Sequence, residues 1–370
     1  MQLRGDLIMD RNLPDILNGH DLSGWKTKRR TEVLNLIREY LFGGIPDEES
    51  IKIDFRVADE RCDNTTMEGQ TIRKTVEVIA KRNGLEFVFT FVLFIPKRAE
   101  APVPAIIMIA NRGISNADPA RHFLSGFWPA EMIVSKGYAT AVFLTQSVAP
   151  DYDEGFTTGF HRLFPELVNN RPDNCFGTIS VWSWAVNKIY EYLSLDSIIN
   201  ADKIAVVGHS RGGKTALWAG AQNEKIAMVV SSCAGCAGDS LARGATGEKP
   251  WQINKRFPYW FNNNYKSFDH NPEMLPFDQH MLLALIAPRP LFISAKTLDS
   301  WADPMGQFNS LKEASKVYEL YGIKGLADEH FPKPDLPISG TRLTFSYRTG
   351  EHDLDYEDWN RILDFADINL

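Results

Sequence analysis

A glycine-flanked serine lies between a strand pattern and a helix pattern in this sequence. Residues 204–207 form an apolar, β-branched run of the kind buried in a parallel sheet, and residues 215–219 suit a helix. Between them, Gly-His-Ser-Arg-Gly at 208–212 fits G-x-S-x-G, a strained turn that lifts a serine hydroxyl above the strand end while the glycines avoid clashes. We therefore predict that Ser210 is a nucleophile; the alternative is a hydroxyl in an ordinary strand-to-helix turn.

The helix expected after Ser210 would direct free N–H groups and the positive end of its dipole at the turn, where they can stabilise an oxyanion. Arg211 would add a fixed positive charge there, and one well-placed donor contributes about 2.7–4 kcal/mol. Lys214 lies one turn further along the same helix face, so its ammonium can lie beside a molecule that Ser210 attacks. The alternatives are an exposed arginine and a solvated helix lysine.

Strand and helix patterns alternate along most of the chain. The first hundred residues indicate a helix that ends at Gly43 and Gly44, then antiparallel strands, two of them joined by the hairpin signal Asn83-Gly84. Beyond a proline-rich link, the alternation predicts a parallel sheet covered on both faces. The expected strands are 51–58, 71–81, 85–95, 104–110, 138–145, 204–207, 226–232, 290–295 and 342–348, and the expected helices include 28–42, 126–136 and 181–195.

This order of elements predicts an α/β-hydrolase fold, a three-layer α/β sandwich with a mainly parallel central sheet. We expect one domain over residues 1–370, with the N-terminal helix and antiparallel strands in 1–100 and the α/β core in 101–370. Residues 237–279 are rich in Trp, Phe, Tyr and Asn and interrupt the alternation. Such insertions usually lie over the carboxyl ends of the strands, so this one is a candidate substrate-binding wall.

Composition and charge argue against several classes of protein. The net charge of −7, with no block of lysine and arginine, does not support nucleic-acid binding. No apolar run approaches the ~18 residues of a membrane span, and the first residues lack the apolar stretch of a secretory signal. Cys62, Cys175, Cys233 and Cys236 are too few for a disulfide scaffold, and the single C-x-x-C lacks the second pair of a zinc site. We expect buried thiols, no metal and no cofactor.

A serine nucleophile needs a base, and an acid that holds the base, in the order Ser, acid, His along an α/β-hydrolase chain. His352 follows the last expected strand, in a loop that Gly350 would tighten, where this fold carries its base. Asp299 lies four residues beyond the expected strand at 290–295, a usual reach for the acid. These positions predict His352 as base and Asp299 as acid.

Three other carboxylates compete with Asp299. Asp303 precedes Pro304 and therefore suits the cap of the next helix. Glu351 and Asp353 adjoin the candidate base in sequence and are expected to point away from it. Asp299 is preferred on these grounds.

Three segments together resemble the glucuronoyl esterases of carbohydrate esterase family 15, particularly the bacterial branch. They are GHSRGGKTALW at 208–218, SWADP at 300–304 and GEHDL at 350–354. The resemblance covers residues 100–370 and implies a metal-free α/β-hydrolase that cleaves the ester between 4-O-methyl-glucuronic acid of xylan and lignin alcohols.

Carried over by position, the resemblance implies Ser210 as nucleophile, His352 as base, and Arg211 as a donor to the oxyanion through its N–H and guanidinium. The residues that it implies as contacts of the glucuronate ring are Lys214, Glu248 and Trp301. A tryptophan offers a flat apolar face and an N–H to a sugar edge, although a core tryptophan is equally consistent with the sequence.

One segment departs from the family pattern. Many members carry a glutamate, acting as the acid, just after the strand that follows the nucleophile, in a segment resembling S-N-E-S-G-C-G-G. Here that segment is SSCAGCAG, and Cys233 takes the glutamate position. Since a thiol cannot hold an imidazolium as a carboxylate does, either Asp299 is the acid or the enzyme is weak or inactive on the family substrate.

Two other functions remain open. An acetyl xylan esterase or other carbohydrate deacetylase would share the triad, whereas the aromatic insertion and Lys214 favour a larger uronic substrate. A carbohydrate-binding pseudoenzyme would account for the missing glutamate, but retention of Ser210, Arg211, Asp299 and His352 argues against it. We expect a monomer that acts on glucuronoxylan or a lignin–carbohydrate ester, and the resemblance suggests a secreted or periplasmic protein.

Overall fold

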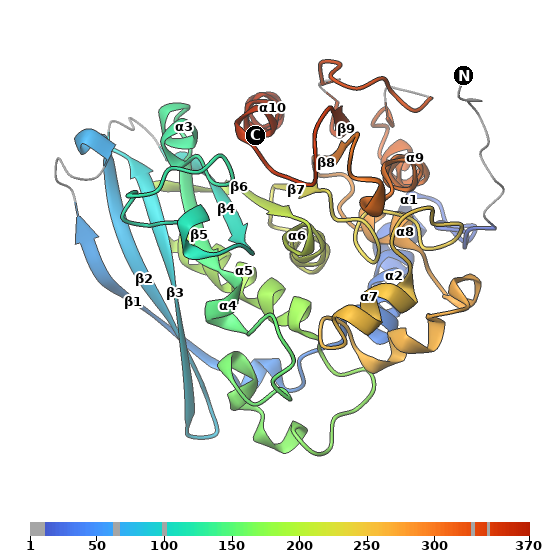
Figure 1. Cartoon of the computed structure of the whole chain (residues 1–370), viewed down its shortest axis with the longest axis horizontal. Coiled ribbons are helices and arrows are strands. Elements are labelled where there is room, and N and C mark those ends of the chain that lie inside the picture. The colour runs from blue at the N-terminus through green and yellow to red at the C-terminus, as the bar shows by residue number, and fades with distance from the viewer. Residues whose placement is uncertain (1–11, 62–66, 98–101, 327–329, 339–340) are drawn as a thin grey trace.

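A nine-stranded mixed sheet runs through the computed structural model, which describes residues 12–61, 67–97, 102–326, 330–338 and 341–370 (Figure 1). The strands are Lys52–Arg61 (β1), Thr71–Arg82 (β2), Leu85–Pro96 (β3), Val103–Ala110 (β4), Ala139–Leu144 (β5), Ile199–His209 (β6), Met228–Ser232 (β7), Leu291–Lys296 (β8) and Leu343–Arg348 (β9). Their order across the sheet is β1-β2-β3-β5-β4-β6-β7-β8-β9. The pairs from β1 to β5 along that order are antiparallel and the remaining pairs are parallel.

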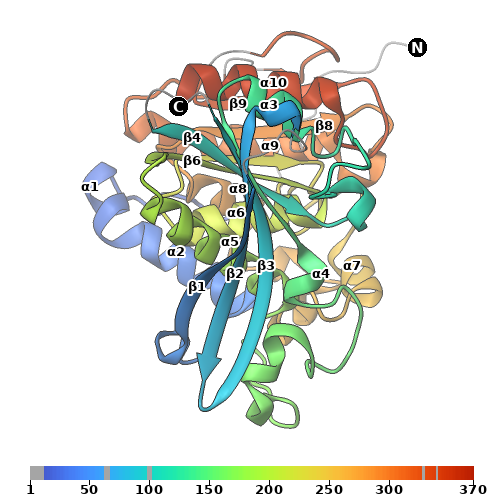
Figure 2. The ribbon, with the colours of Figure 1, turned by 90° about the vertical axis from the view of Figure 1, so that its left-hand side faces the viewer.

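Helices cover both faces of the sheet (Figure 2). On one face lie α3 (Ala130–Ser135) and α10 (Tyr356–Asn369), and on the other lie α2 (Arg30–Ile37), α5 (Thr178–Leu195), α6 (Arg211–Gln222), α8 (Gln279–Ala284) and α9 (Pro304–Leu320). In β4, Ile107 and Ile109 join one buried core, while Ile106 and Met108 join the other. A strand buried on both faces is apolar throughout, which explains the continuous apolar runs in this part of the sequence.

The predicted α/β-hydrolase fold is confirmed, and each expected strand is present with shifted ends. The strand before Ser210 begins earlier than predicted, at Ile199, and the helix expected at 126–136 is reduced to α3. The N-terminal helix is less regular than expected, because π-helical turns flank α2 on both sides. It ends at Gly43 as predicted, where φ is 77° and a Cβ would lie 2.3 Å from the carbonyl oxygen of Cys175.

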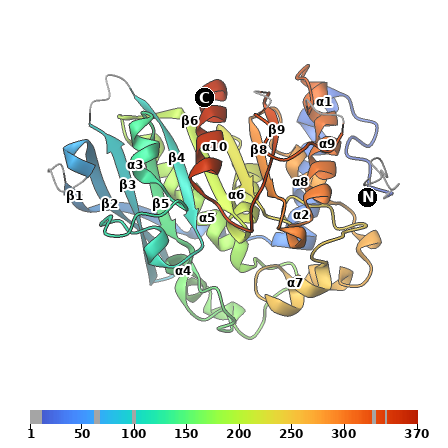
Figure 3. The same ribbon diagram turned by 45° about the horizontal axis from the view of Figure 1, so that its top comes forward.

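The aromatic insertion at 237–279 contains only short elements. These are α7 (Pro250–Arg256) and the 3₁₀ turns Asn263–Phe268 and Pro272–Met274. Figure 3 shows α7 below the sheet, apart from the helices that cover its two faces. None of the helices in the described part of the chain is long and apolar enough to cross a membrane.

Candidate active site

Ser210 occupies a strained turn between β6 and α6, with φ 56° and ψ −122°. Such a conformation costs on the order of 1–3 kcal/mol and persists only where the surroundings enforce it. Gly208 contributes, because a Cβ there would lie 2.0 Å from the Gly212 carbonyl oxygen. The motif predicts that Gly212 also avoids a clash, but a Cβ at Gly212 would come no closer than 3.4 Å to a neighbouring atom. The clash is instead avoided at Gly213, where a Cβ would lie 2.8 Å from Ser231 Oγ. The backbone thus has the strained geometry that the G-x-S-x-G motif predicted.

His352 and Asp299 meet beyond the carboxyl ends of two neighbouring parallel strands, β9 and β8. Nδ1 of His352 lies 2.6 Å from one carboxylate oxygen of Asp299, in a hydrogen bond that the carboxylate accepts. The other carboxylate oxygen accepts from the backbone N–H of Ala302 at 3.3 Å. Asp299 is buried, whereas 44% of the His352 side chain is exposed. A buried carboxylate on Nδ1 fixes both the tautomer and the orientation of the imidazole.

The other candidate acids lie in different surroundings. Asp303 accepts a hydrogen bond of 3.0 Å from the first turn of α9, and so caps that helix as expected. Asp353 forms an ion pair of 2.6 Å with Arg112, and Glu351 is exposed. Of these carboxylates, Asp299 is the one hydrogen-bonded to the His352 ring.

Two residues beside the histidine were not identified from the sequence. The ring of His209 lies 4.6 Å from that of His352, and its Nε2 is 3.5 Å from the Arg112 guanidinium. Burial, with the nearby charge of the Arg112 guanidinium, holds the pKa of His209 well below its usual value, so this ring is neutral. His209 belongs to the G-x-S-x-G segment, which was a usable signal; Arg112 follows β4 without any motif.

The guanidinium of Arg211 is held by an ion pair with the buried carboxylate of Asp151. That carboxylate also accepts hydrogen bonds from the indole of Trp260 at 2.8 Å and from the hydroxyl of Tyr259 at 3.2 Å. Nε of Arg211 is buried and has no hydrogen-bond partner among the described residues. This N–H therefore makes no hydrogen bond with the described part of the chain. Asp151 lies 60 residues before Arg211, and no sequence motif marked it.

Lys214, Glu248 and Trp301 form a second group close to Ser210. Lys214 is buried, and its ammonium donates to the carbonyl oxygen of Ala234, so it is not a solvated helix lysine. Burial lowers the pKa of Lys214, and the charge of Glu248 opposes this shift. The backbone N–H of Glu248 donates to the carbonyl of Trp301 at 2.9 Å. Since 48% of Trp301 is exposed, it is not a core tryptophan.

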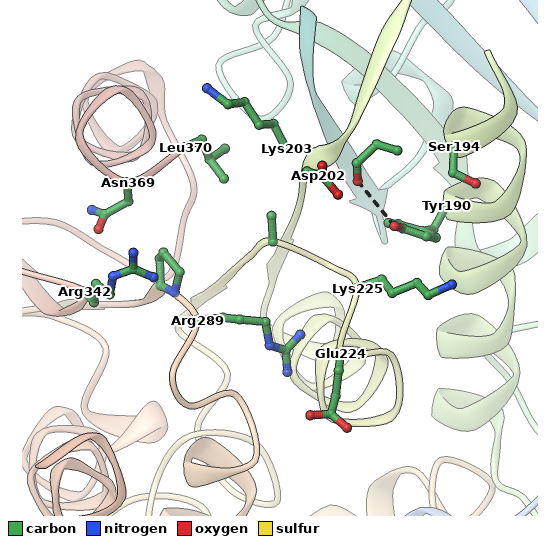
Figure 4. A pocket seen from close by; sticks show the side chains of 13 residues that line it. Tyr190, Ser194, Asp202, Lys203, Glu224, Lys225, Arg289, Arg342, Asn369 and Leu370 are labelled. Atoms are coloured by element: carbon green, nitrogen blue, oxygen red, sulfur yellow. Dashed lines mark hydrogen bonds between the residues drawn. The ribbon is translucent and has the colours of Figure 1, made fainter. Parts of the chain in front are cut away.

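One cavity of about 310 Å³ is lined by all the preferred site residues, and the insertion adds Arg256, Phe257 and Trp260 to it. The preferred residues are Ser210, Arg211, Lys214, Glu248, Asp299, Trp301 and His352. A larger hollow of about 640 Å³ lies at the amino ends of the parallel strands, where Figure 4 shows Lys203 and Arg342 around it. Ligands of open α/β sheets bind at the carboxyl ends of the strands. The smaller cavity is therefore the candidate active site.

Comparison with known proteins identifies the family. A family model described as glucuronyl esterase, fungi, matches residues 78–322. The carbohydrate esterase MZ0003, from an unknown prokaryotic organism, is 31% identical over 374 residues, which cover 94% of this chain and 85% of that protein. The chain belongs to the glucuronoyl esterase family. Its class is therefore that of the carboxylic ester hydrolases.

Solved structures of bacterial glucuronoyl esterases share the fold. A structure described as a promiscuous CE15 esterase from the marine bacterial metagenome has a TM-score of 0.88 and 30% identity, covering 97% of both chains. A glucuronoyl esterase from Solibacter usitatus has a TM-score of 0.88 and 29% identity, covering 96% of this chain and 97% of that one. The resemblance stated from the sequence is confirmed.

This glucuronoyl esterase carries Cys233 beside the His352–Asp299 pair. The thiol sulfur, a carboxylate oxygen of Asp299 and a ring nitrogen of His352 all lie within 4.8 Å of one another. Burial, with the nearby charge of Asp299, raises the pKa of Cys233 well above its usual value. The sequence predicted the Asp299–His352 pair and placed Cys233 at the position of the family's acidic residue, and the structure adds the distances between the three side chains.

The cysteines that the structure describes are free and buried, as expected. They are Cys175, Cys233 and Cys236. Cys62 lies outside the described residues.

Proposed function

We propose that this protein hydrolyses the ester between (4-O-methyl-)glucuronic acid of glucuronoxylan and an alcohol of lignin, by a Ser-His-Asp triad. The observation that carries the proposal is the 2.6 Å contact between His352 Nδ1 and Asp299, in the same cavity as the strained Ser210 turn. Membership of the glucuronoyl esterase family supports an ester of a uronic acid as the substrate class. The cavity contains the residues that would act on such an ester.

In the proposed reaction, Ser210 Oγ attacks the ester carbonyl carbon while His352 Nε2 takes the hydroxyl proton. Asp299 stabilises the imidazolium through Nδ1. Collapse of the tetrahedral intermediate breaks the bond to the alcohol oxygen, which leaves with the proton from His352. Water then hydrolyses the acyl-enzyme by the same steps in reverse order, releasing glucuronate and restoring the serine.

Arg211 would stabilise the oxyanion in both steps. Arg211 lines the same cavity as Ser210, and its positive charge is fixed in place by Asp151. A donor that is already oriented loses little free energy to reorganisation during the reaction. The first turn of α6, which begins at Arg211, would add its dipole and its free backbone N–H groups.

Lys214, Glu248 and Trp301 would bind the glucuronate ring. The buried ammonium and the carboxylate offer a donor and acceptors to sugar hydroxyls within one cavity. The exposed half of Trp301 offers an apolar face to the ring. A simple acetyl group presents none of the hydroxyls that this group would recognise.

A carbohydrate deacetylase is the second candidate, because one of the similar structures is described as a promiscuous esterase. Release of benzyl alcohol from a benzyl ester of glucuronic acid, measured beside release of acetate from acetylated xylan, separates the two. We expect a higher kcat/KM on the glucuronate ester. Preference for acetylated xylan would replace the proposal with the deacetylase, and turnover of neither substrate would indicate a carbohydrate-binding pseudoenzyme.

Replacing Lys214 should change substrate preference more than general activity. We expect Lys214→Ala to reduce kcat/KM on the benzyl glucuronate ester much more than on an aryl acetate, since only the former presents sugar hydroxyls to the ammonium. Polar groups left unpaired in a buried site cost about 1–3 kcal/mol, which corresponds to roughly 5- to 150-fold in kcat/KM.

Lys214→Met is the matched variant, because it keeps most of the buried stem and removes the charge. It should behave like Lys214→Ala in substrate preference with a smaller fall in Tm. Equal losses on both substrates in both variants would instead identify a structural lysine.

A further inference from the structure

The residues Cys233, Asp299 and His352 form a compact group with one sulfur, one oxygen and one nitrogen ligand atom. They follow the carboxyl ends of β7, β8 and β9, three neighbouring parallel strands (Figure 1). Their ligand atoms lie within 4.8 Å of one another, and within the described residues this is the one group of His, Cys and acidic side chains so arranged. All three line the proposed active-site cavity.

This set of atoms suits a thiophilic divalent cation. Cysteine thiolate, imidazole and carboxylate are the ligands that Zn²⁺ takes in proteins, at about 2.0–2.3 Å. The three ligand atoms already lie within 4.8 Å of one another, so small rotations of the side chains would bring them to bonding distance from one ion. Three protein ligands leave a fourth position for water, and the cavity provides room for it.

We propose that Zn²⁺ binds between Cys233, Asp299 and His352 and inhibits the enzyme reversibly. The ion would occupy His352 Nδ1 and an Asp299 oxygen, the two atoms that form the hydrogen bond on which the proposed triad depends. Binding releases the thiol proton of Cys233 to solvent and moves the Nδ1 proton of His352 to Nε2, so that a neutral imidazole holds the ion through Nδ1. The thiolate and the carboxylate then balance the two positive charges of the ion, so the buried site becomes neutral overall.

The inhibition rests on the proposed function, but occupancy of the site does not. The first measurement is therefore spectroscopic. Co²⁺ is added to chelator-treated, desalted enzyme, and the sulfur-to-cobalt charge-transfer absorption is followed. We expect saturation at one ion per chain, with the absorption abolished by competing Zn²⁺. It should be absent in Cys233→Ala and Cys233→Ser, of which the second nearly preserves side-chain volume.

Cys236→Ala is the matched control, since Cys236 is an equally buried thiol outside the group and lies 4.0 Å from the Tyr265 hydroxyl. It should keep the absorption. An absorption that persists in both Cys233 variants, or none in the unmodified enzyme, would overturn the proposed site.

The second measurement is esterase activity during Zn²⁺ titration, with each variant compared with its own metal-free rate. We expect inhibition that a chelator reverses, and a rise of roughly tenfold or more in the inhibitory concentration for Cys233→Ala but not for Cys236→Ala. If Zn²⁺ inhibited the unmodified enzyme, Cys233→Ala and Cys236→Ala equally, the inhibitory ion would bind at a site that does not include Cys233. A chelator alone should not lower activity; a loss that Zn²⁺ restores would show a required metal and contradict the proposal. Cobalt binding to an enzyme without esterase activity would support the site while refuting the proposed function.

Discussion

Ser210→Ala should abolish esterase activity while leaving the protein folded. In the proposed mechanism the serine oxygen forms the acyl-enzyme, and nothing else in the cavity replaces that bond. Removing the nucleophile of a catalytic triad lowers kcat on the order of 10⁶-fold. The measurement is kcat on the benzyl glucuronate ester, with circular dichroism and Tm to verify folding. Turnover close to that of the unmodified enzyme would refute the serine-esterase mechanism.

Ser210→Gly is an informative companion variant. Ser210 has φ 56°, a conformation that glycine adopts without the steric cost imposed by a Cβ. This variant should be as inactive as Ser210→Ala but more stable than it by about 1 kcal/mol, read from denaturant unfolding. Equal stability of the two would mean that the turn stores no strain at this residue.

Asp299→Asn should keep the fold and lose most of the activity. The buried carboxylate accepts from His352 Nδ1 at 2.6 Å, whereas an amide at that place can donate and favour the wrong imidazole tautomer. The expected loss in kcat is on the order of 10⁴-fold. The test is kcat/KM on the glucuronate ester, accompanied by circular dichroism. If Asp299→Asn retained near-full activity, the assignment of Asp299 as the acid would be wrong. Asp303, Glu351 and Asp353 would then be the residues to test.

Three further substitutions test the same assignment. Asp303→Ala removes the cap of α9, so it should lower stability by about 0.5–2 kcal/mol with a far smaller effect on activity than Asp299→Asn. Cys233→Glu, made in the Asp299→Asn background, should restore part of the activity, because it places a carboxylate beside the imidazole again. Cys233→Ala in the unmodified background should matter much less than Asp299→Asn.

Local patterns in the sequence were sufficient to predict the fold. The runs buried on both faces of the sheet are continuously apolar, the hairpin is marked by Asn83-Gly84, and the Ser210 turn is marked by its glycines. These features depend on residues close together in the chain, so periodicity and turn chemistry reveal them. His352 and Asp299 were found in the same way, by their place after particular strands.

Contacts between distant segments were decided only by the tertiary structure. The Asp151–Arg211 ion pair, the contact between the His209 and His352 rings and the burial of Lys214 have no counterpart in local sequence pattern. The distance of Cys233 from the predicted Asp299–His352 pair is another case, because the three residues follow separate strands and meet only when the sheet forms. Strand order and register place such side chains, and both are set by packing across the whole molecule, which local propensity does not encode.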